Sequence, residues 1–221
     1  MDSVKLYHGS RNGIKGDIQP KSRNLCDFGT GFYMGTKPEQ VKDLVFNEMS
    51  PVFYTLNLHL ENIAQQRILI LSDMDWAFFV LYNRGMLKEI KNTAFYQKLA
   101  GMDRDKDIII GPIADDNMTM VMQQFTDGLI TDKTFMECIR CIDYGMQYVA
   151  KTERACKQVE ILRKENIDTT EPNKYQEREN ERRRENNRKL KKTRREYRGQ
   201  GRYLDEILEE YQKQNSDQPD F

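Results

Sequence analysis

Long apolar runs are scarce in this sequence, and their absence excludes whole classes of protein. No stretch approaches the roughly 20 apolar residues of a membrane-spanning helix. The N-terminus begins Met1-Asp2-Ser3 and shows no signal-peptide pattern. We therefore expect a cytoplasmic protein that makes no membrane contact.

Signatures of the common nucleotide and metal sites are also lacking. The chain has no Gly-x-Gly-x-x-Gly after a strand and no Gly-Lys-Ser/Thr loop, so neither a Rossmann site nor a P-loop is readable. Cys138 and Cys141 form one Cys-x-x-Cys pair, but no second pair or nearby histidine completes a tetrahedral zinc site. Helical spacing explains this pair more simply, and we expect no metal.

Apolar residues and charges are unevenly distributed along the chain. Hydrophobic residues make up 38% of the sequence, and residues 166–221 contain almost no apolar cluster before Leu204. Residues 174–203 hold 13 Lys and Arg against 5 Glu, whereas residues 204–221 hold 1 Lys against 6 acids. This pattern predicts a folded domain over residues 1–165 and a charged tail, mostly helical or disordered, over residues 166–221.

Short strands and helices alternate in the first part of the chain. Hydrophobic patterning predicts strands over 3–8, 52–58, 67–71, 107–112 and 145–150. It predicts helices from the N-cap Thr36 to Phe46, after Ser72 and Asp73 with Trp76 in the core, over 117–125 and 132–142, and from Thr152 through Leu162. The elements do not repeat as βαβ units, so we expect an α+β fold with antiparallel strands.

Three short pieces carry side chains suited to binding a ligand. They are Tyr7-His8-Gly9-Ser10, Gly29-Thr30-Gly31-Phe32-Tyr33 and Met146-Gln147-Tyr148-Val149. Each alone has a structural explanation, because a histidine at a strand end is more often a structural residue, glycines before an aromatic usually form a turn, and a strand glutamine is usually exposed. Their order along the chain is more informative than any one of them.

In that order the three pieces resemble ADP-ribosyltransferases of the poly(ADP-ribose) polymerase and diphtheria-toxin type. The matching features are that family's His-Gly-Ser strand, its Gly-x-Gly-hydrophobe-Tyr segment, and the strand that delivers its last catalytic side chain. The chain is also similar, from residue 4 to about residue 162, to an uncharacterised bacterial family placed in the same superfamily. That likeness includes Leu6 to Ser10, Asp27 to Tyr33, Asp75-Trp76, Gly111 to Asp116 and Gln147 to Ala155.

The resemblance implies a fold and a set of ligand contacts. The fold would be α+β, with split antiparallel β-sheets and flanking helices around an NAD cleft, and NAD⁺ would be the substrate. His8 would hydrogen-bond a ribose hydroxyl, the main chain of Gly9 would pair with the nicotinamide amide, and the Tyr33 ring would pack on the nicotinamide. Ser10 and Gly31 complete the expected cofactor-binding set.

The sequence departs from the polymerase pattern at two places. Gln147 stands where the polymerases have a glutamate, and an amide keeps the hydrogen bonds but neither neutralises a developing cation nor acts as a general base. We therefore expect transfer of single ADP-ribose units rather than polymer growth. Val41 and Leu44 stand where the polymerases place a serine and a second tyrosine in the nicotinamide pocket.

Four further residues are candidates for phosphate, acceptor or auxiliary roles. Arg84 is a candidate for NAD phosphates or a pairing residue at a helix end. Asp115 and Asp116 are candidates for the acceptor site or helix caps. Glu153 is an alternative acid, although stabilisation of a helix N-terminus is its simpler role.

The tail also has two interpretations. Its composition is typical of a solvated helix or disorder, whereas the clustered Lys and Arg of residues 174–203 suit contact with nucleic-acid phosphates. Leu204, Ile207, Leu208 and Tyr211 recur at helical spacing and predict a short amphipathic helix that docks on a partner or on its own domain.

Three hypotheses about function follow. The first is a mono-ADP-ribosyltransferase that cleaves NAD⁺ and modifies a macromolecular acceptor, protein or nucleic acid; the resemblance implies a bacterial toxin or phage-defence effector, with an antitoxin as one conceivable partner. The second is a non-catalytic module that binds NAD⁺ or ADP-ribose while the tail recruits a partner or nucleic acid. The third is a nucleic-acid tether, in which the charged tail is the active part.

Overall fold

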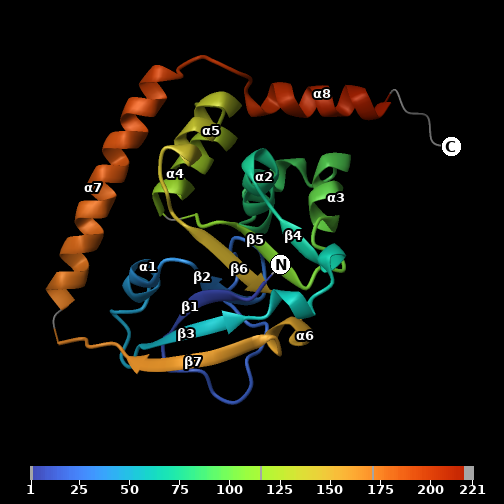
Figure 1. The fold of residues 1–221 in the computed structure, drawn as a ribbon. Coiled ribbons are helices and arrows are strands. Elements are labelled where there is room, and N and C mark those ends of the chain that lie inside the picture. Colours follow the sequence, from blue (N-terminus) through green and yellow to red (C-terminus); the bar gives the residue numbers. More distant parts are fainter. Residues whose placement is uncertain (1, 115, 171, 217–221) are drawn as a thin grey trace. The chain divides into compact units, whose positions relative to one another are not determined.

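The computed structural model describes residues 2–114, 116–170 and 172–216, which form an α+β structure (Figure 1). Its strands are β1 (Val4–Ser10), β2 (Phe32–Gly35), β3 (Val52–Leu58), β4 (Ile68–Ile70), β5 (Ile108–Pro112), β6 (Met146–Ala150) and β7 (Val159–Asn166). Its α-helices are α1 (Pro38–Asp43), α2 (Asp73–Asn83), α3 (Ala94–Gly101), α4 (Asp116–Thr126), α5 (Asp132–Arg140), α6 (Glu153–Cys156), α7 (Pro172–Glu196) and α8 (Leu204–Ser216). Short 3₁₀ turns lie at Leu60–Asn62, Gln65–Arg67 and Lys88–Ile90.

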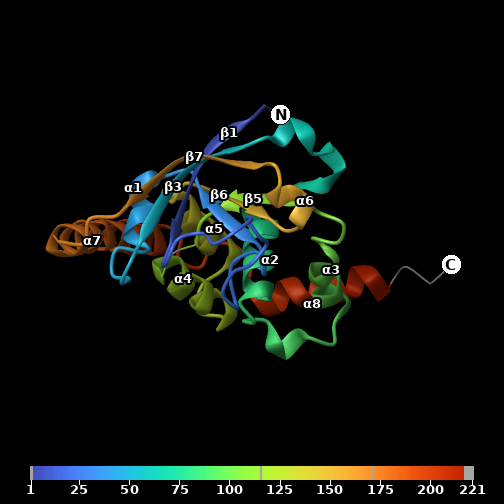
Figure 2. The ribbon, with the colours of Figure 1, turned by 90° about the horizontal axis from the view of Figure 1, so that it is seen from below.

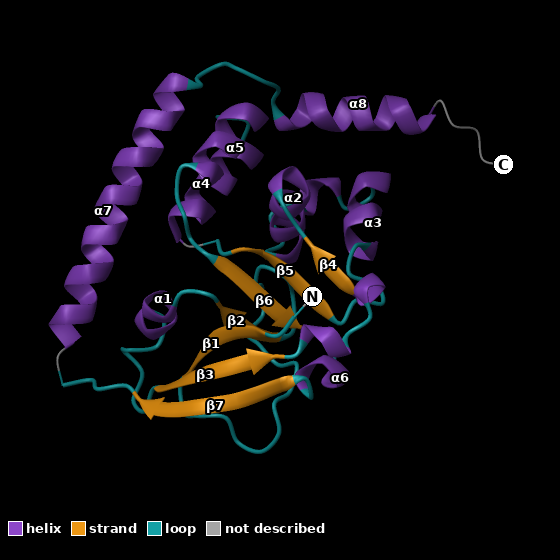
Figure 3. Ribbon diagram, viewed as in Figure 1, coloured by secondary structure: helices purple, strands orange, loops and turns teal. Residues whose placement is uncertain are grey.

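The chain divides into two compact units. The first takes in the chain up to Ser72, Asp103–Ile113 and Gly145–Arg182, and it holds all seven described strands. The second takes in Asp73–Met102, Ala114–Tyr144 and the chain from Arg183 onward. Most of the helices belong to the second unit (Figure 3).

The strands of the first unit form one mixed sheet in the order β4-β5-β6-β2-β1-β3-β7. Every neighbouring pair is antiparallel except β4 and β5, so the predicted antiparallel α+β class is confirmed. Two separate sheets were expected, whereas the described strands are continuous. The pairing of β1 with β2 is nonetheless short. These strands share a single registered pair, Tyr7 with Gly35, whereas β1 and β3 share seven.

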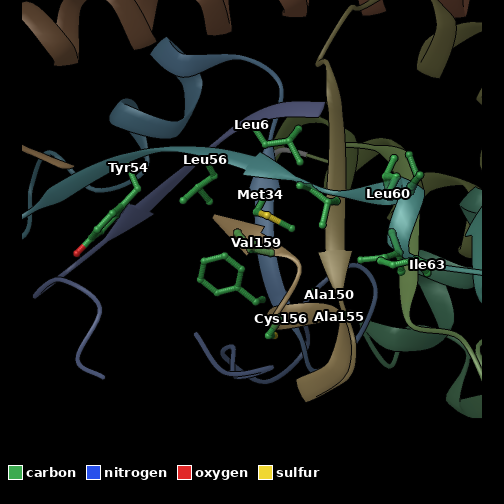
Figure 4. Packing of buried hydrophobic residues seen from close by; sticks show 14 of the residues in the cluster. Leu6, Met34, Tyr54, Leu56, Leu60, Ile63, Ala150, Ala155, Cys156 and Val159 are labelled. Atoms are coloured by element: carbon green, nitrogen blue, oxygen red, sulfur yellow. The ribbon is translucent and has the colours of Figure 1, made fainter. Parts of the chain in front are cut away.

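An apolar cluster on one face of the sheet holds the first unit together (Figure 4). Alternate residues of β3, namely Tyr54, Leu56 and Leu58, are buried in it, as the period of two requires. Leu6 and Met34 join them from β1 and β2. Each buried side chain of this size contributes about 1.5–3 kcal/mol, so this cluster fixes which face each residue of β1 and β2 occupies.

The second unit has its own core. Trp76 and Phe79 on α2 are fully buried, as predicted for the tryptophan. Phe125 of α4 stacks on Phe135 of α5 with their ring centroids 4.6 Å apart. Tyr211 of α8 packs edge-on against Phe95 of α3, with centroids 5.1 Å apart, so the predicted amphipathic helix docks on its own chain.

Helix α7 is anchored in each unit separately. In the first unit, Tyr175 stacks on Phe46 and Arg178 forms ion pairs with Glu39 and Asp43. In the second unit, Leu190 is fully buried. Among the helices within the described residues, none joins the length and the apolar composition that crossing a membrane would require.

Local predictions failed at three places. Residues 159–166 form β7, whereas a helix was predicted through Leu162; seven registered pairs with β3 outweigh the helix-forming Glu, Leu, Arg and Lys of this segment. Thr36 does not cap α1, whose N-cap is Lys37; the Thr36 hydroxyl instead accepts a hydrogen bond from the Met146 N–H. Helix α3 was not predicted.

A buried carboxylate joins the strands β5 and β6 to their flanking segments. Asp107 is 2% exposed and accepts hydrogen bonds from Arg67, Arg154 and Thr152. Burial acts to raise the pKa of Asp107, but these three partners outweigh it and hold the pKa below its ordinary value. The ionised form of Asp107 therefore stabilises the folded state.

We expect Asp107→Asn to lower the free energy of unfolding by about 2 kcal/mol at pH 7, because two charge-assisted hydrogen-bond partners lose their acceptor charge. A lowered folded pKa means that this stabilisation is present above the unfolded pKa and is lost as pH falls through the folded value. The difference from wild type should therefore shrink in acid, which urea unfolding at several pH values measures. Asp105→Asn is the control, since Asp105 is exposed with φ 62°, which asparagine tolerates. Equal losses in both variants would contradict the prediction.

Candidate functional site

His8 lies where β1 and β2 separate. Beyond the Tyr7–Gly35 pair the two strands share no further registered pair, and the His8 ring bridges them through Nδ1, 2.7 Å from the main-chain oxygen of Tyr33. A carbonyl oxygen only accepts, so Nδ1 carries the hydrogen. In the neutral ring Nε2 is therefore left as a hydrogen-bond acceptor.

The surroundings of His8 favour that neutral form. Its ring packs against Phe32, with centroids 4.4 Å apart, and against Tyr54 at 6.2 Å. Burial lowers the pKa of His8, and the bond to the Tyr33 carbonyl opposes that shift only in part. At neutral pH the residue is a fixed, uncharged acceptor rather than a cation.

Gly9 has a packing role of its own. Helix α1 lies against β1 in the first unit (Figure 2), and a Cβ added at Gly9 would stand 2.9 Å from Cγ2 of Val45 and 3.0 Å from the Val41 carbonyl oxygen. No larger residue fits under α1 at this point. The predicted contacts of Gly9 and the neighbouring Ser10 with a ligand stay predictions.

Two residues stand where the polymerases place a serine and a second tyrosine in the nicotinamide pocket. Val41 is buried and Leu44 is 70% exposed.

Tyr33 holds the loop that precedes it. Its hydroxyl donates to the Gly29 carbonyl at 2.7 Å and accepts from the Phe28 N–H at 2.9 Å. Gly29 has φ 69°, which favours glycine, and a Cβ added at Gly31 would overlap Cγ1 of Val149 on β6. The glycines of this segment are thus required by the turn and by its close approach to β6.

Gln147 is buried, not exposed as a strand glutamine usually is. It is 6% exposed, and its Nε2 donates to Oδ2 of Asp27 at 2.8 Å and to the Pro112 carbonyl at 2.9 Å. Register places Gln147 opposite Gly35 and Val149 opposite Tyr33, so Gln147 and Tyr33 project from the same face of neighbouring strands.

Asp27 is the site residue that sequence reasoning missed. It is 8% exposed and lies 120 residues from the glutamine that it binds. The signal available in the sequence was an acid at the head of a glycine-rich loop whose other residues suit a tight turn. Nothing local to Asp27 indicates its partner.

The structure brings some of the predicted residues together and not others. His8 and Tyr33 are in direct contact, but through the main chain of Tyr33; the His8 ring lies on the face of Phe32 and Tyr54, and the Tyr33 ring lies on the face of Gln147. The two rings therefore lie on adjacent strands but project from opposite faces of the sheet.

The remaining predicted residues belong to other elements of the chain or lie outside the described residues. Arg84 belongs to the second unit, where its guanidinium donates to the Ala114 carbonyl at 2.8 Å and to the Thr119 hydroxyl. Asp115 and the side chain of Asp116 lie outside the described residues. Glu153 is exposed in the first turn of α6, where an acid stabilises the helix dipole.

Metal ligation has no support within the described residues. These contain no group of three or more His, Cys, Asp or Glu side chains placed to hold an ion. Cys138 lies in α5 and Cys141 at its C-cap. Burial raises the pKa of Cys138 to about 12, which keeps it a thiol instead of the thiolate that metals bind.

We expect Tyr33→Phe to loosen the loop while keeping the ring, because the hydroxyl is the partner of both the Phe28 amide and the Gly29 carbonyl. Hydrogen exchange at the Phe28 amide should become roughly 10-fold faster, corresponding to about 1.4 kcal/mol of local stability. Tyr148→Phe is the matched control on β6. Unchanged exchange in Tyr33→Phe, or equal acceleration in both variants, would show that the hydroxyl does not hold the loop.

The chain was compared with known proteins. No curated protein matched it, and no solved structure did so either. A family model matched residues 4–161, which include the strands β1 to β6 and the start of β7. Since the match covers well over half of the chain and contains His8, Asp27, Tyr33 and Gln147, the protein belongs to the family described as "Protein of unknown function (DUF3990)".

Proposed function

We propose that this protein is a mono-ADP-ribosyltransferase with an ADP-ribosyltransferase-like fold, which binds NAD⁺ at the separation of β1 and β2. The observation that carries the proposal is His8, a neutral imidazole held by the Tyr33 carbonyl with Nε2 as an acceptor. An acceptor of this kind suits a ribose hydroxyl. The short β1–β2 ladder supports the same proposal, since beside His8 the two strands share no registered pair.

Tyr33 and Gln147 support the proposal from the neighbouring strands. They share the face opposite the His8 ring, so NAD⁺ bound at the separation of β1 and β2 would have to contact both faces, and both residues are fixed by hydrogen bonds to the loop at residues 27–29. A rigid aromatic ring beside a fixed amide suits a flat nicotinamide and its ribose. The resemblance to ADP-ribosyltransferases assigns the same residue positions to that ligand.

The proposed reaction breaks the bond between C1′ of the ribose and the nicotinamide nitrogen. Both electrons of that bond go to nicotinamide, which leaves as a neutral molecule, and the ribose passes through an oxocarbenium-like transition state. A nucleophilic oxygen or nitrogen of the acceptor then bonds to C1′ and loses its proton to water. We further propose, as the resemblance to ADP-ribosyltransferases implies, that the protein acts as a bacterial toxin or phage-defence effector.

The test is nicotinamide release from labelled NAD⁺, with candidate protein, RNA and DNA acceptors present. We expect wild type to release nicotinamide and His8→Ala to bind NAD⁺ roughly 10-fold more weakly, because one buried acceptor is lost. Affinity of wild type should also fall as the medium becomes more acidic than the lowered pKa of His8, since a proton on Nε2 removes the acceptor.

His59→Ala is the matched control, since the sequence contains two histidines and His59 lies outside this site, bound to Glu61 and Glu160. It should leave NAD⁺ affinity unchanged. Absence of both nicotinamide release and NAD⁺ binding by wild type would refute the proposal. Tight NAD⁺ binding without release would instead identify a binding module, the function favoured by an amide at position 147.

We propose a second contact, with nucleic acid, on the part of α7 in the second unit. Arg184, Arg188, Lys191 and Arg195 are exposed and recur at the spacing of one helix face. The opposite face carries the buried Asn186, Leu190 and Thr193. Within the described ion pairs none of these four bases has an acidic partner, so their charge is available to phosphates. These bases would hold a nucleic-acid acceptor or partner.

This contact predicts a specific dependence on salt. If each of the four bases neutralises one phosphate, the affinity for single-stranded nucleic acid should fall with salt. The logarithm of the binding constant, plotted against the logarithm of salt concentration, should have a slope of about −3. The variant R184Q/R188Q/K191Q/R195Q should weaken binding and flatten that slope in a fluorescence titration. The control K15Q/R104Q/K157Q/K164Q removes the same charge from scattered exposed positions and should retain most of the slope. Equal effects of both variants would show that net charge, not α7, governs binding.

A further inference from the structure

We infer that Asp27 is a positioning residue, whose carboxylate orients the Gln147 amide so that its oxygen faces the ligand; this inference rests on the proposed NAD⁺ site. The pair is buried on both sides, with Asp27 8% and Gln147 6% exposed. Asp27 Oδ2 lies 2.8 Å from Gln147 Nε2. The two residues come from a loop and a strand 120 positions apart, so only the folded first unit brings them together.

The orientation of the amide follows from its two neighbours. Nε2 carries two hydrogens, and both acceptors within reach, Asp27 Oδ2 and the Pro112 carbonyl, take one each. A flipped amide would set its oxygen against two other oxygens, so that arrangement is excluded. Oε1 makes no hydrogen bond to the described residues, which leaves it as the acceptor for a ribose hydroxyl.

The loop keeps the Asp27 carboxylate in place. Phe28 and Gly29, the next two residues, are bound by the Tyr33 hydroxyl, and the Lys151 ammonium donates to the Phe28 carbonyl. Lys151 also pairs with Asp103 at 3.1 Å, so it is fixed in turn. These contacts fix the main chain that directly follows Asp27.

The Asp27 carboxylate also makes up in part for the negative charge that a glutamine lacks at position 147. A charged acceptor on Nε2 polarises the amide and makes Oε1 more negative, because hydrogen bonds in a low-dielectric interior reinforce one another. A ribose that gains positive character would therefore meet a stronger acceptor than an isolated glutamine provides. The proton stays on Nε2 throughout, and no bond to the protein forms.

A reciprocal exchange tests this inference. Asp27→Ala should bind NAD⁺ roughly 10-fold more weakly, because the amide loses one of the two acceptors that orient it. Gln147→Glu places two carboxylates at the distance of one hydrogen bond, so one of them holds a proton and its folded pKa is raised. The double variant D27N/Q147E restores a donor facing an acceptor at position 27 but sets an oxygen against the Pro112 carbonyl, so it should regain only part of the NAD⁺ affinity.

Thermal unfolding between pH 5 and pH 8 gives a readout independent of activity. A raised folded pKa adds stability below the unfolded value that is lost as pH rises, so Gln147→Glu should melt roughly 5 °C lower, relative to wild type, at pH 8 than at pH 5. D27N/Q147E should show a smaller difference, since the carboxyl introduced at position 147 then faces an amide donor at position 27. Lys151, Asp103 and Tyr33 are titratable groups among the contacts that hold the loop after Asp27, and all these variants retain them.

The outcomes separate this inference from the proposed function. Weakened NAD⁺ binding by Asp27→Ala and its recovery in the exchange support the inference even if wild type releases no nicotinamide, a result that would refute only the transferase. Wild-type affinity in Asp27→Ala, or the same melting profile in Gln147→Glu and D27N/Q147E, would overturn the inference while leaving NAD⁺ cleavage standing. Absence of NAD⁺ binding by wild type would overturn both.

Discussion

The hydrogen bond from His8 to the Tyr33 carbonyl is the interaction on which the site depends. It spans the one place where the sheet of the first unit is held by a single registered pair, and a side chain there replaces the missing ladder bond. Because an imidazole reaches farther than a main-chain N–H, β1 and β2 can diverge without leaving the Tyr33 carbonyl unpaired. The same bond fixes the tautomer of His8, and burial, which outweighs the opposing effect of this bond, lowers the pKa and keeps the ring neutral.

A second constraint acts on the loop before β2. Its backbone is bound by the Tyr33 hydroxyl and by Lys151, and its acid is bound by the Gln147 amide. Burying polar groups costs free energy unless each has a partner, so these contacts stabilise one loop conformation and disfavour others. Tyr33 thus links both halves of the site, because its carbonyl holds His8 and its hydroxyl holds the loop.

Much of the fold could be predicted from the sequence, and the failures have physical causes. Residues 52–58 were predicted with correct bounds because the segment is rich in β-forming residues and is bounded by polar stretches. The segment from Thr152 through Leu162 was predicted as helix because Ala155, Val159 and Leu162 recur at helical spacing, whereas β7 begins at Val159; pairing along β3 is a tertiary effect that no local pattern shows. The contact of Asp27 with Gln147 was missed for the same reason, since it joins residues 120 positions apart.

Packing explains the glycines of the site but not all of its polar residues. Gly9 fits beneath α1 and Gly31 beside Val149, so packing alone accounts for both. Packing does not account for Asp27 and Gln147: a buried polar pair adds little stability over apolar residues of similar volume, and losing one member leaves the other unpaired. The bond to the Tyr33 carbonyl accounts for Nδ1 of His8, whose ring packs against Phe32 and Tyr54, but not for Nε2. Oε1 of Gln147 and Nε2 of His8 make no hydrogen bond to the described residues, and we propose that these two atoms bind the ligand.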